Sequence, residues 1–488
     1  MSILEAATAA ALPKAGGDEA AIANLKAAFE CQQDAFASDR SPSLAERRSR
    51  VEKLLGMLAG HRSQIRIALS ADFGAHPEPA SDLIEVLGVM ARTQYALAHI
   101  EEWMRPVARD VDAAMFGETK AFVQSQPKGV VGNIVPWNFP FDLSIGPLVE
   151  MLAAGNRVII KPSEYTPACA ALLRDMVAAT FDPDLVHVVV GGLDLAQAFA
   201  DVPWNHLLYT GSPQVGRQIM QAAARNLTPV TLELGGKCPA VMTPGSVTAE
   251  NVQSVIGTKI IKNGQMCISA DYCLVPRGDV ERFVGLSAAF MERAAPDYSR
   301  SAECTGMISL RHMDRISGML EEARAHQCRI VPLEKEGPVD RATRRMPISL
   351  VIDPPAGLRI MEEEIFGPIL PVIPYDTLDE AITTINAGER PLGVYVFGEE
   401  QAAVSAVLEG TTSGGATVNA CALQGALPSL GFGGVGMSGM GRHHGVDGFR
   451  EFSNQRGMVV TGAGNHIDAF YSPYAKAAAI VEGALGPV

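Results

Sequence analysis

The sequence of 488 residues lacks a long apolar run, a basic block and a paired-cysteine motif. No stretch of about 18 uncharged apolar residues occurs, so we expect no membrane span. The formal net charge is −14 and lysine and arginine are not clustered, which argues against nucleic acid as a partner. The N-terminal residues 1–17 lack the basic start of a secretory signal, and we expect them to form a tail or a small docking segment.

The eight cysteines are scattered, and none forms the C-x-x-C pair that is typical of zinc ligands. In a chain of this length, scattered cysteines indicate reduced thiols in a reducing compartment. His443 and His444 are adjacent, so on regular structure their side chains would point in different directions. We therefore expect a cytoplasmic protein without a metal site.

Apolar residues make up 47% of the chain and charged residues 19%, which is typical of a folded protein with a large core. At roughly 100–200 residues per domain, the length indicates two to four domains. Residues 20–105 show the apolar spacing of helices, and Ser43 is placed to cap one of them.

Short apolar segments then alternate with helical ones, a pattern that predicts βαβ units around a buried parallel sheet. Nucleotides commonly bind such sheets at the carboxyl ends of the strands. The expected strands lie in residues 129–137, 157–163, 186–190, 206–210 and 228–234. After Gly236 the alternation resumes with strands at 271–276, 368–373 and 393–398 and helices near 279–293 and 312–326, which predicts a second α/β domain.

Two residues stand out as candidates for covalent and acid–base chemistry. Cys267 follows Asn263, Gly264 and Gln265, which favour a turn, and a turn can expose a thiol for attack; the alternative is a buried apolar cysteine. Glu233 lies in a strand of the expected sheet, where burial would raise its pKa and suit a general base. The alternative places Glu233 on a polar face at the strand end.

Asn138 lies between two prolines in PWNFP, so its amide could donate to an oxyanion or could simply belong to a rigid turn. Gly211 and Ser212 follow an expected strand and begin a helix. This junction could bind a pyrophosphate, or Ser212 could be a plain N-cap followed by Pro213.

The glycines at 434, 436 and 439 match G-x-G-x-x-G, but no strand precedes them and no βαβ unit surrounds them. We expect a close-packed loop there and not a dinucleotide fingerprint. Ser163, in KPSEYTP, does not lie in a G-x-S-x-G nucleophile elbow.

Taken together, the motifs resemble those of the aldehyde dehydrogenase superfamily in residue type, order and spacing, from about residue 25 to 460. The six motifs are PWNFP with Asn138, KPSE with Lys161 and Glu164, TGS with Gly211 and Ser212, LELGGK with Glu233, GQMC with Cys267, and EEIFGP with Glu364 and Phe366. Within the superfamily the sequence looks like the class 3 branch, and there like the coniferyl aldehyde dehydrogenases. Segments such as NLTPVTLELGGK and GFGGVGMSGMGRHHG support this narrower resemblance.

The resemblance implies a reaction through a covalent intermediate. Cys267 would attack the aldehyde carbon to give a thiohemiacetal, whose oxyanion the Asn138 amide and the Cys267 backbone N–H would hold. Hydride transfer to a nicotinamide would leave a thioester, and Glu233 would activate the water that releases the acid. This role of Glu233 argues against the coenzyme A-using relatives.

The resemblance also implies where the cofactor binds. Lys161 and Glu164 would bind the adenosine ribose, Gly211 and Ser212 would approach the pyrophosphate, and Glu364 would hold the nicotinamide ribose with Phe366 nearby. Pro136, Trp137 and Ser163 complete the expected cofactor-binding set. Glu164 could bond both ribose hydroxyls, which favours NAD, although the branch often accepts NADP.

Two positions depart from the family pattern. The segment KNGQMC replaces the Asn-Ala-Gly-Gln-Thr-Cys that is common in this branch, so Met266 lies beside the nucleophile. Asp142 follows PWNFPF, where an apolar residue is more usual. Both changes bear on the shape of the substrate tunnel and on the assignment of coniferyl aldehyde as substrate.

We therefore expect an α/β protein with an aldehyde dehydrogenase-like fold: a doubly wound cofactor domain, an α/β catalytic domain and a small oligomerisation arm. The expected ranges are 20–105 and 130–235 for the NAD(P)-binding domain, 236–425 for the catalytic domain, and 106–129 and 426–470 for the arm. By resemblance we expect a homodimer that oxidises aromatic or medium-chain aldehydes. The alternatives are a cysteine-dependent esterase without a redox role and a non-catalytic structural homologue.

Overall fold

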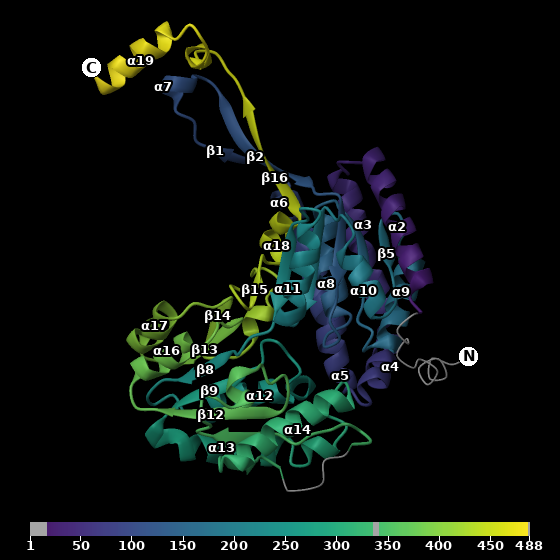
Figure 1. The fold of residues 1–488 in the computed structure, drawn as a ribbon, viewed down its shortest axis with the longest axis vertical. Coiled ribbons are helices and arrows are strands. Elements are labelled where there is room, and N and C mark those ends of the chain that lie inside the picture. Colours follow the sequence, from purple (N-terminus) through teal and green to yellow (C-terminus); the bar gives the residue numbers. More distant parts are fainter. Residues whose placement is uncertain (1–16, 335–340, 487–488) are drawn as a thin grey trace.

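The computed structural model describes residues 17–334 and 341–486, which form three β-sheets with helices packed around two of them (Figure 1). Residues 1–16, where we expected a tail, lie outside the described part. Within the described ranges, no helix is both long and apolar enough to cross a membrane.

A six-stranded sheet forms the centre of the first unit, and its strands are parallel except for one short edge strand. Its strands, in spatial order, are β15 (Gly439–Met440), β7 (Val230–Leu234), β6 (His206–Gly211), β3 (Val130–Ile134), β4 (Arg157–Lys161) and β5 (Val186–Val188). The five parallel strands are the ones that the alternating pattern predicted. Their runs of Val, Ile and Leu are buried on both faces, which is typical of a parallel sheet covered by helices.

Helices cover both faces of this sheet, so the unit is doubly wound as expected. One face packs against α3 (Leu44–Gly60), α4 (Arg62–Phe73), α6 (Val89–Trp103), α8 (Asp142–Ala153) and α9 (Pro167–Thr180). The other face packs against α2 (Glu19–Ser38), α10 (Leu193–Ala200) and α11 (Pro213–Ala224). The start of α3 confirms the expected cap, because the Ser43 hydroxyl and the Glu46 carboxylate form a capping box.

A seven-stranded sheet forms the second unit, and it confirms the α/β pattern expected after Gly236. Its strands, in spatial order, are β10 (Arg329–Pro332), β11 (Ser349–Ile352), β12 (Ile369–Tyr375), β9 (Tyr272–Pro276), β8 (Pro239–Met242), β13 (Gly393–Phe397) and β14 (Gly415–Val418). All of the pairings are parallel except that of β10 with β11. Apolar clusters join this sheet to α12 (Ala249–Ile260), α13 (Val280–Ala294), α14 (Leu310–Ala325), α16 (Leu378–Ala387) and α17 (Gln401–Gly410).

A three-stranded antiparallel sheet extends away from the two units as an arm (Figure 1). It consists of β1 (Val107–Arg109), β2 (Lys120–Pro127) and β16 (Ser453–Val460). Strand β16 lies along β2 over their full length, from the Ser453–Pro127 pair to the Val460–Lys120 pair. Beyond β16 the chain continues to α19 (Ala475–Leu485) near the tip.

Part of the segment that we expected in the arm packs elsewhere. Residues 439–440 form β15 at the edge of the six-stranded sheet, and α18 (Gly445–Glu451) packs against α8 and α6. Phe449 and Phe452 are completely buried in the same apolar cluster as those helices. Burial of these two rings places α18 with the unit of the six-stranded sheet and not with the exposed arm. In this part of the chain the arm therefore begins at β16.

The glycine-rich loop is close-packed, as the sequence predicted. Gly439 has a φ of +147° and lies opposite Glu233, and a Cβ at Gly439 would overlap the carbonyl oxygen of Leu232. The loop therefore approaches strand β7 so closely that only glycine fits.

Replacing Gly439 with alanine should push β15 away from β7. We expect Gly439→Ala to lower the free energy of unfolding by about 2 kcal/mol, because the substitution adds a steric clash to an unfavourable backbone conformation. The apparent melting temperature of the purified protein measures this loss. Gly457→Ala is the matched control, since a Cβ at Gly457 meets no atom within 4 Å, and an equal loss in both variants would contradict this account.

Candidate active site

Cys267 lies after α12, at the end of a turn that connects this helix to β9. Lys262, Asn263 and Gly264 have φ values of +48°, +55° and +75°, so three consecutive residues adopt left-handed backbone. A Cβ at Gly264 would overlap the carbonyl oxygen of Gly367. The expected turn is confirmed, and it leaves the Cys267 side chain half-buried.

Asn138 approaches this turn from the other sheet. It belongs to the loop between β3 and α8, and its side-chain Nδ2 donates a hydrogen bond to the carbonyl oxygen of Gln265, at 3.3 Å. Gln265 lies two residues before Cys267. The structure therefore brings the Asn138 amide to the turn that bears Cys267, although 129 positions separate the two residues in the sequence.

Glu233 lies near the carboxyl end of β7 and is 3% exposed. Neither of its carboxylate oxygens has a hydrogen-bond partner among the described residues. Thr231, which precedes it on the same face, is also buried, so this face of the strand is not a solvated one. A buried carboxyl group without partners is costly for stability and is a recurrent feature of functional sites.

Burial shifts the pKa values of the ionisable groups of the site upward. Burial raises the pKa of Glu233 well above its usual value. Burial, together with the charges of Glu364 and Glu233, raises the pKa of Cys267 to about 12. The negative charges of both carboxylates disfavour ionisation of the thiol, so the titrations of Glu233, Glu364 and Cys267 depend on one another. A base must therefore remove the thiol proton when the nucleophile reacts.

Glu364 and Phe366 come from the loop that precedes β12. The Glu364 carboxylate lies against Gly235, where a Cβ would overlap it, and burial raises its pKa to about 8. Its Oε1 atom has no partner among the described residues. Phe366 has a φ of +51°, and its ring meets that of Trp137 edge-on, with centroids 5.2 Å apart.

The remaining candidate cofactor residues lie at the carboxyl ends of neighbouring parallel strands. Lys161 ends β4, is 2% exposed, and donates from Nζ to Glu164 Oε2 at 2.7 Å. Ser163, two residues after β4, accepts a hydrogen bond from the backbone N–H of Tyr165. Pro136 and Trp137 follow the adjacent strand β3 and are half-buried.

Gly211 and Ser212 occupy the junction between β6 and α11. A Cβ at Gly211 would overlap the Tyr209 hydroxyl, so glycine is required for packing there. Ser212 is the N-cap of α11, and its hydroxyl accepts from Val215 N at 3.4 Å, with Pro213 at the first helical position. The plain N-cap is thus present. The start of a helix is in general also a place where the helix dipole favours an anion.

Comparison with known proteins identifies the family. Residues 8–458 match the model of the aldehyde dehydrogenase family. The chain is 42% identical over 431 residues to a probable coniferyl aldehyde dehydrogenase from Caulobacter vibrioides, covering 88% of this chain and 89% of the relative. It is 36% identical over 442 residues to aldehyde dehydrogenase family 3 member A2 from Pongo abelii, covering 87% and 86%. The chain belongs to the aldehyde dehydrogenase family.

Solved structures agree with this assignment. The substrate-bound state of an aldehyde dehydrogenase, AldH, from Staphylococcus aureus superposes with a TM-score of 0.88 at 30% identity, covering 94% of this chain and 99% of that one. An aldehyde dehydrogenase from Mycobacterium tuberculosis complexed with NAD+ gives a TM-score of 0.80 at 26% identity, covering 90% and 91%. The expected fold class and the expected enzyme class, an aldehyde dehydrogenase, are confirmed.

Several charged residues near the site were missed from the sequence. Glu85 and Lys262 form a completely buried ion pair, and Arg92 forms another with Glu150. Glu85 and Glu150 each lie between two apolar residues in a helical segment, whereas Lys262 and Arg92 each follow an apolar residue and precede a polar one. A charge among buried apolar neighbours was the available signal, because such a charge needs a partner.

The two departures from the family pattern have different surroundings. Met266 is 8% exposed and packs into the apolar cluster of the catalytic unit. Asp142 begins α8 and is half-buried near the two ion pairs. Burial and the negative charge of Glu85 raise the pKa of Asp142 to about 6, while Arg92 and Lys262 oppose this rise.

His443 and His444 are both buried, and each contacts aromatic rings. Their rings lie against each other and against Phe432, and His443 Nδ1 lies 3.1 Å from the Arg92 guanidinium. Across residues 17–334 and 341–486, no group of three or more His, Cys, Asp and Glu side chains could hold a metal ion. Burial also lowers the pKa of both imidazoles far below the usual value, which favours their neutral forms.

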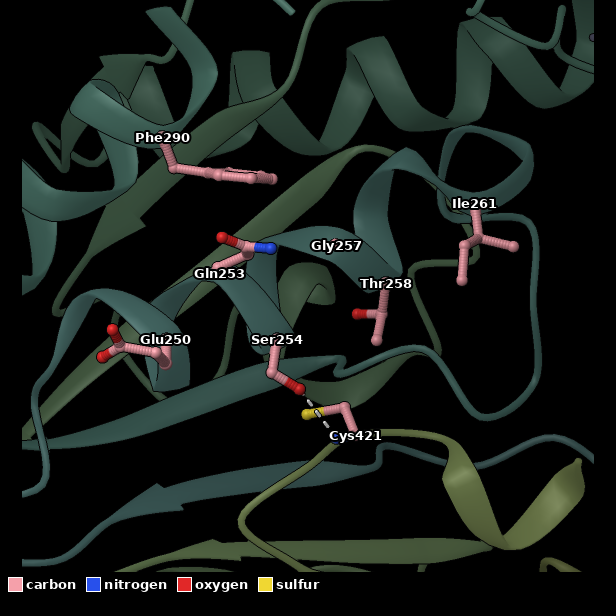
Figure 2. A pocket seen from close by; sticks show the side chains of 8 residues that line it. All are labelled: Glu250, Gln253, Ser254, Gly257, Thr258, Ile261, Phe290 and Cys421. Atoms are coloured by element: carbon pink, nitrogen blue, oxygen red, sulfur yellow. Dashed lines mark hydrogen bonds between the residues drawn. The ribbon is translucent and has the colours of Figure 1, made fainter. Parts of the chain in front are cut away.

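A cavity of about 400 Å³ lies beside α12 (Figure 2), and Asn138, Glu233 and Cys267 are not among the residues that line it. The backbone N–H of Cys421 donates to the Ser254 hydroxyl at its edge, at 2.9 Å. Glu250, Gln253, Gly257, Thr258, Ile261 and Phe290 complete its lining. Cys421 packs against the same apolar cluster as Cys267, which makes it a useful comparison for the nucleophile.

The raised pKa of Asp142 predicts how stability depends on pH. The folded state holds the Asp142 proton up to about pH 6, whereas the unfolded state releases it near 3.8, so the contribution of Asp142 to stability falls as the pH rises between these values. Asp142→Asn should therefore raise the apparent melting temperature at pH 7.5 and change it little at pH 4. Asp376→Asn is the control, because Asp376 pairs with Arg277 on the surface and its pKa is lowered. A lower melting temperature for Asp142→Asn at pH 7.5 would refute this explanation.

Proposed function

We propose that this chain oxidises an aldehyde to the carboxylic acid with NAD(P), through a thiohemiacetal and a thioester on Cys267. The observation that supports this proposal most strongly is the convergence of three groups from different segments. The Asn138 amide lies at the turn that bears Cys267, and the Glu233 carboxyl is buried, unpaired and close enough to shift the thiol pKa. A nucleophile, an oxyanion donor and a general base are the groups that acyl transfer from a thioester requires.

The first step forms a carbon–sulfur bond. A base, for which ionised Glu233 is the candidate, takes the Cys267 thiol proton, and the sulfur attacks the aldehyde carbon, which moves an electron pair onto the carbonyl oxygen. The Asn138 Nδ2 and the Cys267 backbone N–H stabilise the resulting oxyanion. Because the Asn138 amide donates to the Gln265 carbonyl in this structure, it is already oriented toward the cysteine turn.

The residues at the strand ends fit a dinucleotide. Glu364 has a carboxylate oxygen without a partner among the described residues, and Lys161 and Glu164 form an ion pair in which Lys161 is buried and Glu164 is partly exposed. The start of α11, where backbone N–H groups favour an anion, follows Gly211. A bound NAD(P) would supply the hydride acceptor that the oxidation of the aldehyde requires. Glu364 would hold the nicotinamide ribose, with Trp137 and the adjacent Phe366 ring packed nearby.

Hydrolysis of the thioester needs a water molecule and a base. Glu233, ionised by loss of its proton before this step, takes a proton from water while the oxygen attacks the acyl carbon. The carbon–sulfur bond then breaks and the Cys267 sulfur leaves. Burial makes ionised Glu233 a stronger base than a carboxylate in water, because the same burial raises its pKa.

We propose a phenylpropenal such as coniferyl aldehyde, or another aromatic or medium-chain aldehyde, as substrate. The name of the Caulobacter vibrioides relative supports the first choice. An aliphatic aldehyde is the alternative, because Met266 and Asp142 depart from the pattern of the branch that the coniferyl aldehyde assignment rests on. For the cofactor we propose NAD, with NADP as an alternative, because the Glu164 carboxylate suits two ribose hydroxyls and would repel a 2′-phosphate.

We also propose a homodimer in the cytoplasm. The arm exposes Phe470, Tyr471 and Tyr474, and such apolar groups are typical of a protein interface. All eight cysteines are free, and the nucleophile must stay reduced to react. We assign cofactor binding to 20–105 and 130–235, catalysis to 236–425, and assembly to the arm.

A substrate panel tests the proposed function. The purified protein should form NADH or NADPH with at least one of coniferyl aldehyde, benzaldehyde and straight-chain aldehydes. Cys267→Ala should lower the turnover number at least about 10³-fold, because no other group can form the thioester. Cys421→Ala is the matched control and should retain turnover.

The outcomes separate the candidate functions. Ester hydrolysis that needs Cys267, together with no cofactor reduction by any aldehyde, would replace the dehydrogenase with an esterase. Absence of turnover and of cofactor binding would favour a non-catalytic homologue. The best aldehyde in the panel decides the substrate class.

A further inference from the structure

Lys262 and Glu85 form an ion pair in the interior, between the cysteine turn and the N-terminal helical region. Their side chains are 1% and 0% exposed, and Lys262 Nζ donates to Glu85 Oε1. Glu85 lies in a π-helix (Ser81–Gly88), a rare conformation that is frequent at functional sites. Burying two charges is costly, so their retention calls for a role other than stability alone.

Both members of the pair bind the loop that bears Asn138. Lys262 Nζ donates to the Asn138 carbonyl oxygen at 2.5 Å and lies 4.2 Å from the centre of the Phe139 ring. The second carboxylate oxygen of Glu85 accepts from the backbone N–H groups of Phe141 and Asp142, at 3.0 and 2.9 Å. The ion pair thus holds this loop by three main-chain hydrogen bonds.

Lys262, Asn138 and Gln265 form a closed ring of hydrogen bonds. The Lys262 side chain donates to the Asn138 main chain, the Asn138 side chain donates to the Gln265 main chain, and the Gln265 side chain donates to the Lys262 main chain at 2.8 Å. Each side chain in the ring therefore fixes the position of the main chain of the next residue. The ring joins the amide that would hold the oxyanion to the turn that would supply the backbone N–H.

We propose that Lys262 and Glu85 are positioning residues that hold the two donors of the oxyanion site, the Asn138 amide and the Cys267 backbone N–H, in one geometry. This inference rests on the proposed function, since it concerns the same reaction. The ammonium group binds the carbonyl side of Asn138, so the pair acts through Asn138 and the cysteine turn and does not touch the substrate. Lys262 occupies the position of the first Asn in the Asn-Ala-Gly-Gln-Thr-Cys pattern that is common in the branch. A chain with that pattern has no ammonium group here, so the ion pair with Glu85 is a feature of the present chain.

The double variant Glu85→Gln/Lys262→Gln tests this role without leaving an unpaired buried charge. Glutamine at both positions keeps groups that can form hydrogen bonds, but removes the ionic attraction and shortens the Lys262 side chain. We expect the turnover number for the best aldehyde to fall about 10- to 100-fold, because misplacing an oxyanion donor by about 1 Å has an effect of this size. The KM for NAD should change less than about threefold, because none of the three hydrogen bonds of the ring involves Lys161, Glu164 or Glu364, which would bind the two riboses.

Hydrogen–deuterium exchange provides a readout that does not depend on turnover. In the double variant, peptides covering residues 136–142 and 262–268 should both exchange faster. The single variant Lys262→Arg keeps the charge beside the intact Glu85, so its protection and its turnover number should lie between those of the double variant and the wild type. Arg277→Gln is the control for loss of an ion pair, since Arg277 and Asp376 form an exposed pair. The control should leave both segments and the turnover number unchanged.

The outcomes distinguish this inference from the proposed function. A wild-type protein that oxidises no aldehyde contradicts the proposed function, and the exchange experiment still tests whether the ion pair couples the two segments. Unchanged exchange in either segment of the double variant overturns the positioning role. Faster exchange in both segments with unchanged turnover overturns it as well.

Discussion

A buried ion pair between Lys262 and Glu85 lies where the two large units of this aldehyde dehydrogenase meet. The candidate active site forms only where these two units are in contact, because Asn138 follows a strand of one sheet and Cys267 precedes a strand of the other. The pair binds the main chain of the Asn138 loop, and the backbone of Lys262 begins the left-handed turn that leads to Cys267. The geometry of the site thus depends on two charges that have no access to water.

The exclusion of water from the site also shifts the pKa values of its ionisable groups. Burial raises the pKa values of Glu233, Glu364 and Cys267, so each group favours its neutral form. A neutral thiol is inert until a base removes its proton, and a buried carboxylate is a strong base once it is ionised. Burial of Glu233 therefore lowers the stability of the folded protein and raises the basicity of the Glu233 carboxylate.

Much of the site could be predicted from the sequence because its residues lie in short, continuous motifs. The five parallel strands of the six-stranded sheet follow from runs of apolar residues, and the turn before Cys267 follows from Asn263 and Gly264. The roles of Cys267, Glu233 and Asn138 came from a resemblance, since the local pattern left alternatives open for each. The fold class and the family are confirmed, whereas the individual roles remain predictions.

The long-range contacts could not be predicted in the same way. Lys262 and Glu85 are 177 positions apart, and a single sequence gives no register between a helix and a distant turn. The position of residues 439–451 was missed for a similar reason. The glycine-rich stretch resembles a connection, and only the burial of Phe449 and Phe452 shows that it packs against the cofactor unit.

The central claim is that Cys267 forms a thioester which Glu233 helps to hydrolyse. Mass spectrometry of the Glu233→Gln variant, after incubation with the best aldehyde and NAD, tests it most directly. The account predicts one acyl group on the peptide that contains Cys267, with a mass equal to the aldehyde less two hydrogens, and NADH formation that stops after about one turnover. An unmodified Cys267 peptide, an acyl group on another cysteine, or undiminished steady turnover would contradict it.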